Sequence, residues 1–387
     1  MLAITEGPRK EELDRAGIGV LTCPWDPDNI ASLIAELKPE VIHMHASGRP
    51  FIGDLLGEAL LKLPKIPLVQ TNIFGRLENP REDAWTDYRL FISWTSCVQA
   101  ARRSFRRLDE NFFRRASVAV YPLDAIEPVA ADRVAAFRRQ HGVRENEVLF
   151  GRLSRPEPNK WTNLALDAFR RALRRTGNIK LLLREPPPAV AAQLRAAPDA
   201  DRFVILPATA DAEELLLTMS ALDVVLHTSS IGESFGYGIA EPMNLGKPVV
   251  THSVPWGDQA QIELARHGEC GFVTSTPAAM AKAMVRLATN RELMQNLGAE
   301  AQRHIRELAD PESSLNRLEA VLRAAVRKTD NPFAREDLTR AKGAAKYLDE
   351  QQFGHFLLEQ TALRPFYYRV RFHEFRKAFF PMLAANG

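Results

Sequence analysis

The sequence contains little that would indicate a secreted, membrane-spanning or metal-binding protein. Its 387 residues include only three cysteines, and Cys23, Cys97 and Cys270 lie far apart, in no metal-ligand spacing. We interpret them as reduced, buried thiols of a cytoplasmic protein. No run of about 18 apolar residues is present, so the sequence predicts no transmembrane helix. The opening segment, MLAITEGPRKEELDRAG, lacks the basic and apolar regions of a secretory signal.

The charge and composition are those of an ordinary globular protein. Lys and Arg number 51 and Asp and Glu number 48, which gives a net charge of +3. That excess is too small to indicate nucleic-acid binding. The contents of 45% hydrophobic and 26% charged residues are typical of soluble domains. Because single cores rarely exceed about 250–300 residues, the length predicts two globular domains.

Short apolar runs alternate with helical patterns along most of the chain. Strands are expected in the first half at 18–24, 40–46, 66–72, 88–95 and 117–123, and in the second half at 147–154, 178–184, 203–208, 222–230 and 247–253. This order indicates parallel sheets built from βαβ units, and the Val, Ile and Leu content fits sheets covered on both faces. The sequence therefore predicts an α/β fold with two Rossmann-like, doubly wound parallel-sheet domains that face a cleft at the strand carboxyl ends.

Changes in composition divide the chain into four parts. We expect a first domain over 1–123, a polar linker over 124–146, a second domain over 147–327 and a helical tail over 328–387. Within the tail, the segment 364–380 interleaves arginines with phenylalanines and tyrosines. Two interpretations stay open: its apolar side packs back on the first domain, or it lies on an anionic membrane surface.

The segment ESFGYGIAE, residues 233–241, combines features of a phosphate-binding site. A glycine-bearing turn at 236–238 follows a predicted strand and leads into a predicted helix, so backbone amides at the helix N-terminus can approach a phosphate closely. Positive charge is expected from Arg152, Arg155 and Lys160, which follow the first strand of the same domain. Strand ends of one sheet converge on one crevice, so these cations and the amides are expected to share a ligand.

Glu233 and Glu241 lie on either side of that turn, eight positions apart. A carboxylate accepts hydrogen bonds from vicinal sugar hydroxyls, so the pair suggests a ligand with a sugar on each side of its phosphates. A nucleotide sugar, with ribose, diphosphate and donor sugar, has that order. The alternative is two solvent-facing carboxylates that favour a helix N-terminus.

The order of these motifs resembles retaining glycosyltransferases of the GT-B fold, specifically glycosyltransferase family 4 with its E-x7-E pattern. VLFGRLSRPEPNK (148–160), GKPVVTHS (246–253) and HGECGFV (267–273) resemble motifs of its donor domain, and VIHMHA (41–46) resembles a strand of its first domain. The resemblance implies that Arg152 and Lys160 bind the diphosphate of the donor. It places Phe235, Gly236, Tyr237 and Gly238 at the donor, Glu241 on the ribose and Glu233 on the donor sugar near its anomeric carbon. It implies retention of configuration, no metal ion and no cofactor beyond the donor itself.

Several positions depart from the family pattern. The interval from Arg152 to Lys160 is longer than usual, which makes Arg155 an alternative phosphate ligand, and Pro242 falls past the first turn of a helix that starts at Gly236. Pro242 therefore predicts a later helix start or a kink.

The first domain departs further. Only residues 1–40 precede VIHMHA, without a Gly-Gly loop, so a truncated chain, a misplaced start or a reduced acceptor domain are all consistent with it. The usual Thr-x-His segment is TNIFGR, where Asn72 and Arg76 are the nearest polar candidates. His45, with His43, completes the acceptor-side candidates, the alternative being hydrogen-bonded core histidines.

We therefore expect a bacterial-like, cytoplasmic glycosyltransferase of polysaccharide biosynthesis, peripheral at the inner membrane face if the tail binds lipid. The donor would be a UDP or GDP sugar, and the acceptor a glycan, a lipid-linked saccharide or a similar molecule. Two alternatives stay open. One is a nucleotide-sugar-binding scaffold with an incompetent acceptor side, and the other is a different GT-B activity, such as an epimerase or a phosphorylase.

Overall fold

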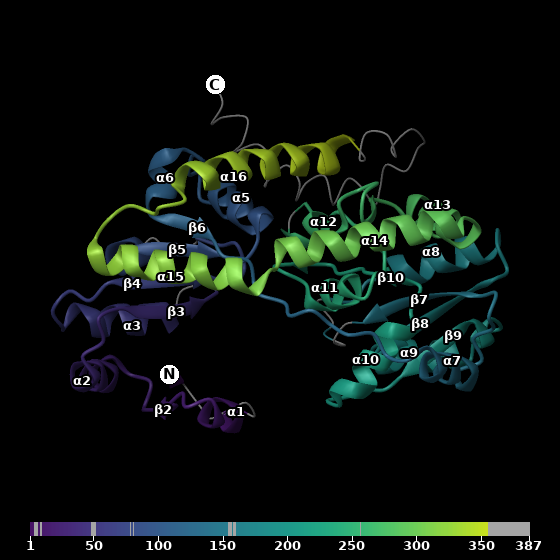
Figure 1. Cartoon of the computed structure of the whole chain (residues 1–387), viewed down its shortest axis with the longest axis horizontal. Helices are drawn as coiled ribbons and strands as arrows, with labels where there is room; N and C mark the ends of the chain where they lie inside the picture. Colours follow the sequence, from purple (N-terminus) through teal and green to yellow (C-terminus); the bar gives the residue numbers. More distant parts are fainter. Residues whose placement is uncertain are drawn as a thin grey trace.

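The computed structural model describes residues 1–3, 7, 10–47, 52–77, 79, 81–153, 157, 160–255 and 257–354. Figure 1 shows two α/β units side by side, joined by an extended segment and by helices near the C-terminus. All strand pairs in the described part of the chain are parallel. Of the helices in these ranges, none is both long and apolar enough to cross a membrane.

The first domain contains a four-stranded sheet in chain order, β3-β4-β5-β6. The strands are β3 (Ile42–Ala46), β4 (Leu68–Asn72), β5 (Tyr88–Phe91) and β6 (Ala116–Val118), and the helices between them are α3 (Ile52–Leu61), α4 (Glu82–Trp85), α5 (Trp94–Arg103) and α6 (Glu110–Arg114). Before them, β1 (Leu2–Ala3) and β2 (Leu21–Thr22) form a separate pair, with α1 (Lys10–Arg15) and α2 (Pro27–Leu37). The run expected as a strand at 18–24 thus contributes β2, outside the four-stranded sheet.

The second domain contains a six-stranded sheet in the order β14-β12-β10-β7-β8-β9. Its strands are β7 (Val148–Leu153), β8 (Ile179–Arg184), β9 (Phe203–Leu206), β10 (Val224–Leu226), β12 (Val249–His252) and β14 (Gly271–Thr274). The helices are α7 (Ala131–Gln140), α8 (Leu164–Leu173), α9 (Pro188–Arg195), α10 (Ala212–Ala221), α11 (Tyr237–Asn244), α12 (Ala260–Ala265), α13 (Pro277–Thr289) and α14 (Arg291–Leu308), with a 3-10 turn at Ala200–Arg202. The strand order reverses between β7 and β10, as in a doubly wound fold, so a ligand is expected at their carboxyl ends.

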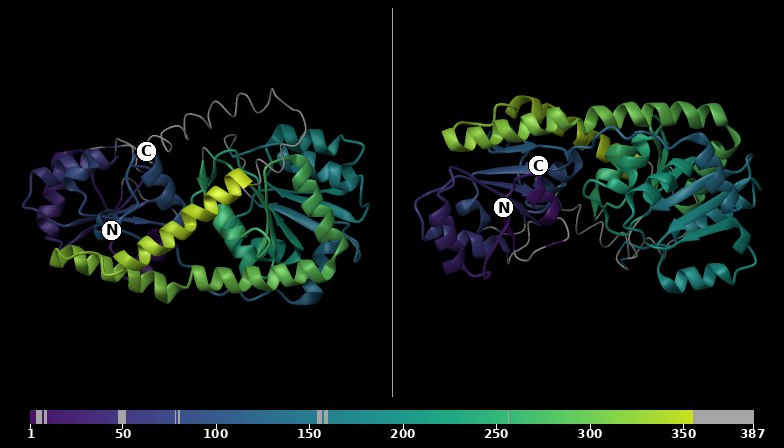
Figure 2. Two further views of the ribbon diagram at one scale, coloured as in Figure 1. Left: turned by 90° about the horizontal axis from the view of Figure 1, so that it is seen from above. Right: turned by 60° about the horizontal axis from the view of Figure 1, so that its bottom comes forward.

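Two further helices return the chain to the first domain, as Figure 2 shows. Val321, Ala324 and Ala325 of α15 (Pro311–Arg327) form one apolar cluster with Val69 and its neighbours in the first sheet. The sequence pattern placed residues up to 327 in the second domain, whereas α15 covers the first sheet. Next, α16 (Ala334–Asp349) packs on α5, α6 and β6 and runs into a short π-helix, Glu350–Gly354. The basic aromatic segment 364–380 lies outside the described residues.

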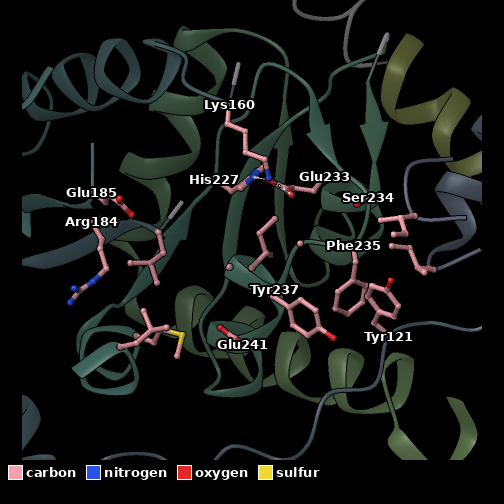
Figure 3. A pocket seen from close by; sticks show the side chains of 18 of the residues that line it. Tyr121, Lys160, Arg184, Glu185, His227, Glu233, Ser234, Phe235, Tyr237 and Glu241 are labelled. Carbon is pink, nitrogen blue, oxygen red and sulfur yellow. Dashed lines mark hydrogen bonds and ion pairs between the residues drawn. The ribbon is translucent and has the colours of Figure 1, made fainter. Parts of the chain in front are cut away.

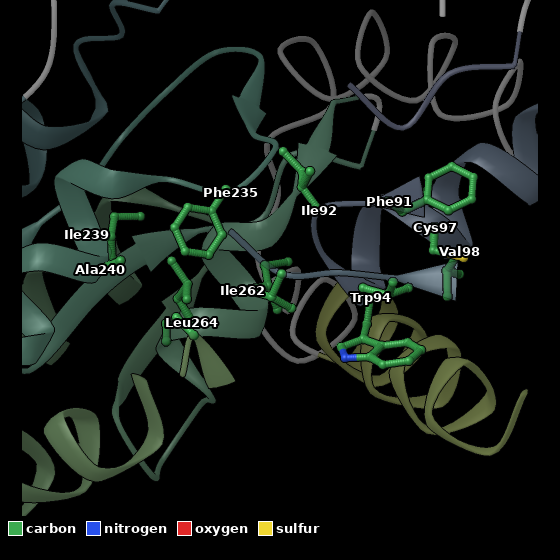
Figure 4. Close-up of a cluster of buried hydrophobic side chains, with 14 of the residues drawn as sticks. Phe91, Ile92, Trp94, Cys97, Val98, Phe235, Ile239, Ala240, Ile262 and Leu264 are labelled. Carbon is green, nitrogen blue, oxygen red and sulfur yellow. The ribbon is translucent and has the colours of Figure 1, made fainter. Parts of the chain in front are cut away.

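The two domains share one apolar cluster, shown in Figure 4. Phe235 and Ile239, at the start of α11, lie in the same cluster as Ile92 and Trp94 of the first domain. A polar contact reinforces it, because the half-buried Glu263 accepts hydrogen bonds at the N-terminus of α5 across the interface, from Thr95 N at 2.9 Å and from Trp94 N at 3.3 Å. The start of α11 is therefore packed directly against the first domain.

Candidate active site

A cavity of about 490 Å³ opens where the ends of β7 and β10 meet. Both domains line it, and Figure 3 shows its side chains. The lining residues are Ile73, Phe74, Ile92 and Tyr121 of the first domain and Leu153, Lys160, Arg184, Glu185, Thr209, Leu215, Met219, His227, Glu233, Ser234, Phe235, Gly236, Tyr237, Gly238, Ile239 and Glu241 of the second. Its size is that of a small-molecule site.

Glu233 is the centre of a charged cluster in this cavity. The ammonium of Lys160 lies 3.2 Å from each of its carboxylate oxygens, and Nε2 of His227 lies 3.3 Å from Oε1. Burial alone would raise the pKa of Glu233, yet the hydrogen bonds and charge supplied by His227 and Lys160 hold that pKa below its ordinary value. Glu233 is therefore an ionised carboxylate at neutral pH, and both of its oxygens are hydrogen-bond acceptors.

The backbone around Glu233 is held by strand pairing and by a hydrogen bond to a side chain. Strand β11 (Gly232–Glu233) pairs with β13 (Asp258–Gln259), and the amide of Glu233 donates to Oε1 of buried Gln261 at 2.9 Å. Gly232 has φ +72°, and a Cβ there would lie 1.8 Å from the carbonyl oxygen of Asp258. Only glycine fits that position, so the chain delivers the Glu233 side chain to one place.

The N-terminus of α11 faces the same cavity. The helix starts at Tyr237 after Gly236, whose φ is +98°, and a Cβ on Gly238 would lie 2.8 Å from the carbonyl oxygen of Leu153. The first backbone N–H groups of a helix have no acceptor within it, so the amides of Tyr237 and Gly238 are suited to bind an anion. Gly236, Tyr237 and Gly238 all line the cavity.

Pro242 lies inside α11 instead of delaying its start. Proline lacks the N–H that would bond to the carbonyl of Gly238 four residues earlier. The helix nevertheless continues to Asn244, and the carbonyl oxygen of Pro242 accepts from the amides of Leu245 and Lys247 at 3.0 and 3.1 Å. Of the two expected outcomes, the later start is thus wrong.

Glu241 lies one turn further along α11 and also lines the cavity. It is half-buried, and within the described part of the chain its carboxylate has no hydrogen-bond or ion-pair partner. Burial raises the pKa of Glu241 above its ordinary value. A carboxylate that is partly desolvated without a partner is an available acceptor for a ligand.

Arg152 lies beside the cavity but not among its described lining residues. Its guanidinium is buried, donates to the carbonyl oxygens of Thr228 at 3.1 Å and Lys160 at 3.3 Å, and stacks 4.3 Å from the ring centroid of Trp161. Burial lowers the pKa of Arg152 to about 10, which keeps it charged at neutral pH. The contacts hold the Lys160 segment against the end of β10. Arg155, the alternative phosphate ligand, lies outside the described residues.

The acceptor-side candidates differ in what surrounds them. His45 is exposed on β3, and its Nδ1 lies 3.5 Å from the hydroxyl of Tyr121, which lines the cavity. His43 instead pairs with Oγ1 of Thr71 at 2.7 Å, and burial together with the charge of His45 lowers its pKa to about 4.

Asn72 is buried at the end of β4 and bonds both the amide and the carbonyl oxygen of Arg76. The two residues thereby close the loop that carries Ile73 and Phe74 to the cavity. This contact uses the Asn72 side chain within its own loop.

Sequence reasoning did not single out His227 or Tyr121. His227 is the first residue after β10, and its Nδ1 pairs with Oγ1 of Thr251 at 3.0 Å, which orients the ring toward Glu233. The sequence placed His227 inside the strand expected at 222–230, so the end of β10 at Leu226 was not available as a signal. Tyr121 follows β6 and packs on Tyr237 with ring centroids 6.3 Å apart, a contact between domains that sequence spacing cannot reveal.

The chain also contains two Asp-x-Asp pairs, and neither lines the cavity. Asp26 caps α2, and Asp199 pairs with Arg170 at 2.9 Å. No three His, Cys, Asp or Glu side chains in the described ranges are grouped as a metal site would require. All three cysteines are free; Cys97 and Cys270 are buried and Cys23 is partly exposed.

Comparison with known proteins agrees with this architecture. Residues 145–290 match the family model described as glycosyl transferases group 1. Among solved structures, Anabaena Alr3699/HepE in complex with UDP has 19% identity and a TM-score of 0.69, with 84% of this chain and 91% of that chain covered. A glycosyltransferase from Rickettsia africae ESF-5 has 14% identity and a TM-score of 0.69, with 85% and 90% covered.

No curated protein sequence matches the chain. The structural neighbours show that the chain has the GT-B fold, and residues 145–290 of its second domain are similar to the group 1 glycosyl transferase model. The fold class predicted from the sequence is confirmed.

Proposed function

We propose that this protein is a retaining glycosyltransferase of family 4 that moves a sugar from a nucleoside diphosphate sugar to a saccharide or lipid-linked acceptor, without a metal ion. One observation carries the proposal: an ionised Glu233, paired with Lys160 at 3.2 Å, lies at the switch point beside the N-terminus of α11. An anion site and a hydroxyl acceptor thus share one cavity of about 490 Å³. The HepE complex with UDP supports the ligand class.

The chemistry of each lining group assigns an order to the donor. The diphosphate would lie on the amides of Tyr237 and Gly238 with the ammonium of Lys160 beside it. Glu233 would accept from the hydroxyls of the donor sugar, and Glu241 from those of the ribose. Phe235 is buried against Tyr121 and Tyr237, so it shapes the site from behind.

Transfer would break the bond between the anomeric carbon and a phosphate oxygen. Negative charge then develops on the diphosphate, where Lys160 and the helix amides are already oriented and need no reorganisation. Arg152 would add positive charge from behind the Lys160 segment. The acceptor hydroxyl would attack from the face that the diphosphate leaves, and its proton would pass to a phosphate oxygen, which gives retention.

The test is transfer itself. The purified full chain is incubated with UDP and GDP sugars and a panel of saccharide acceptors, and the anomeric configuration of the product is read by NMR. A product with the donor's configuration is expected, and Glu233→Gln should lower kcat. A product of inverted configuration would overturn the retaining mechanism. If neither transfer nor donor hydrolysis is seen with any donor, the proposed activity is overturned.

A nucleotide-sugar-binding scaffold is the second candidate, and the Asn72 side chain favours it. That side chain bonds the backbone of its own loop, so the acceptor side has one polar group fewer than expected. Donor binding without transfer or hydrolysis across the panel would support the scaffold.

Membrane contact through residues 364–380 stays a prediction. Sedimentation with anionic vesicles should retain more of the full chain than of a chain that ends at 354, after α16 and its π-helix. Equal retention would remove the membrane role.

A further inference from the structure

The end of the cavity at β8 carries a second, unassigned carboxylate. Arg184 is the last residue of β8, Glu185 follows it, and both line the cavity with Thr209, Leu215 and Met219. Figure 3 shows Arg184 and Glu185 on the other side of the cavity from Glu233 and Tyr121. In the donor order proposed above, the end of the cavity away from Glu233 receives the nucleobase.

Glu185 is held in an unusual backbone conformation. Its φ is +50°, a left-handed value that non-glycine residues adopt rarely and at a cost in free energy. Its amide donates to the carbonyl oxygen of Leu206 at 2.9 Å, so the pairing of β8 with β9 fixes the backbone there. The side chain is half-buried at the cavity wall and has no hydrogen-bond or ion-pair partner within the described ranges.

Both terminal nitrogens of its neighbour Arg184 have partners other than Glu185. The Arg184 guanidinium donates to Glu214 at 2.9 Å, to the carbonyl oxygen of Pro207 at 3.0 Å and to the hydroxyl of Thr218. Its ion pair is with Glu214 and not with Glu185, and its Nε is buried without a hydrogen-bond partner in the described part of the chain. Glu185 supplies the carboxylate at this end of the cavity, and Leu215 and Met219 supply apolar surface.

We propose that Glu185 selects guanine, so that the donor is a GDP sugar; this inference rests on the proposed function. A carboxylate only accepts hydrogen bonds. Guanine presents two adjacent donors, N1–H and the 2-amino group, which match the two oxygens of a carboxylate. Uracil presents one N–H between two carbonyl oxygens, so the second carboxylate oxygen would meet an acceptor. Leu215 and Met219 would contact the face of the base.

The experiment pairs a deletion in the protein with a deletion in the ligand. Binding of GDP, UDP and IDP, which lacks the 2-amino group, is measured by titration calorimetry with the full chain and with Glu185→Ala. Glu213→Ala is the matched control, because Glu213 is an exposed carboxylate on α10 that pairs with Arg133. A charge-assisted hydrogen bond is worth about tenfold or more in affinity.

The parent chain should bind GDP about tenfold more tightly than IDP and more tightly than UDP. Glu185→Ala should bind GDP and IDP equally, while Glu213→Ala should keep the parent preference. Equal binding of GDP and IDP by the parent, tighter binding of UDP than GDP, or an unchanged ratio in Glu185→Ala would overturn the guanine assignment and leave the proposed function standing. Binding of none of the three nucleotides would overturn the proposed function as well.

Discussion

Replacement of Glu241 by glutamine should make the protein more stable and a poorer binder of its donor. Burial raises the pKa of Glu241, with no partner in the described chain to compensate, so its ionised form is unfavourable in the unliganded folded state. One unit of pKa corresponds to about 1.4 kcal/mol. Because the side chain is only half-buried and solvent screens it, we expect a gain of about 1 kcal/mol or less in the free energy of unfolding.

The same change should cost donor affinity. Loss of charge-assisted hydrogen bonds to ribose hydroxyls, worth about 1.5–3 kcal/mol, would weaken nucleotide binding by about tenfold to a hundredfold. The two effects have opposite signs because the site is arranged for the ligand and not for the empty protein. A carboxylate kept only for folding would give the reverse.

The effect of Glu241 on the free energy of unfolding depends on pH. The folded pKa of Glu241 lies above the unfolded value of 4.5, so its destabilising effect is absent below pH 4.5 and complete above the folded pKa. The unfolding temperature of Glu241→Gln should therefore be higher than that of the parent by about 2–4 °C or less at pH 7, and equal to it near pH 4. A lower unfolding temperature at pH 7, or unchanged nucleotide affinity, would refute the reasoning.

Three further predictions concern the groups around this site. Glu233→Gln should destabilise the protein at pH 7. The lowered pKa of Glu233 contributes stability above pH 4.5 that is lost as the pH falls through the folded pKa. Urea unfolding at pH 7 and pH 4 checks this, and a larger loss of stability at pH 4 than at pH 7 would contradict it. Arg103→Ala should lower kcat more than donor affinity. Arg103 joins the first domain to Asp258 at 3.2 Å and to the carbonyl oxygen of Gly257 at 2.8 Å, beside β11. Steady-state kinetics measures both constants, and an unchanged kcat would contradict the prediction. Glu263→Ala should lower the free energy of unfolding by about 1–3 kcal/mol, because it leaves the amides of Trp94 and Thr95 at the start of α5 without an acceptor. Chemical unfolding measures this, and a variant as stable as the parent would show that water replaces the carboxylate.

Much of the second domain could be predicted because its signals are local. All six residues of β8 are buried, and Ile179 with Leu181, Leu182 and Leu183 gives the local apolar signal of a strand. The glycines at 236 and 238 indicate a tight turn with a close backbone approach. The carboxylates at 233 and 241 lie within the same short segment. Local sequence therefore predicted the turn, the helix and both glutamates of the candidate site.

The parts that could not be predicted depend on contacts between distant segments. The sequence of α15 has an amphipathic pattern that predicts a helix. The pattern does not indicate which of the two sheets Val321 will pack on. Asn72 was a candidate for contact with an acceptor, but its side chain accepts a hydrogen bond from the amide of Arg76 in its own loop. The partners of Glu233 lie at 160 and 227, and only the adjacent ends of β7 and β10 bring them together.

The most direct test of the donor site is calorimetric titration of the full chain with UDP and GDP sugars. Lys160→Ala removes the lining cation that pairs with Glu233. Lys346→Ala is the matched control, because the Lys346 side chain is 81% exposed on α16. We predict one-to-one binding of at least one nucleotide sugar to the parent and to Lys346→Ala, with affinity at least about tenfold weaker in Lys160→Ala. Absence of binding, or equal affinity in the parent and in Lys160→Ala, would contradict the assignment of this cavity as the donor site.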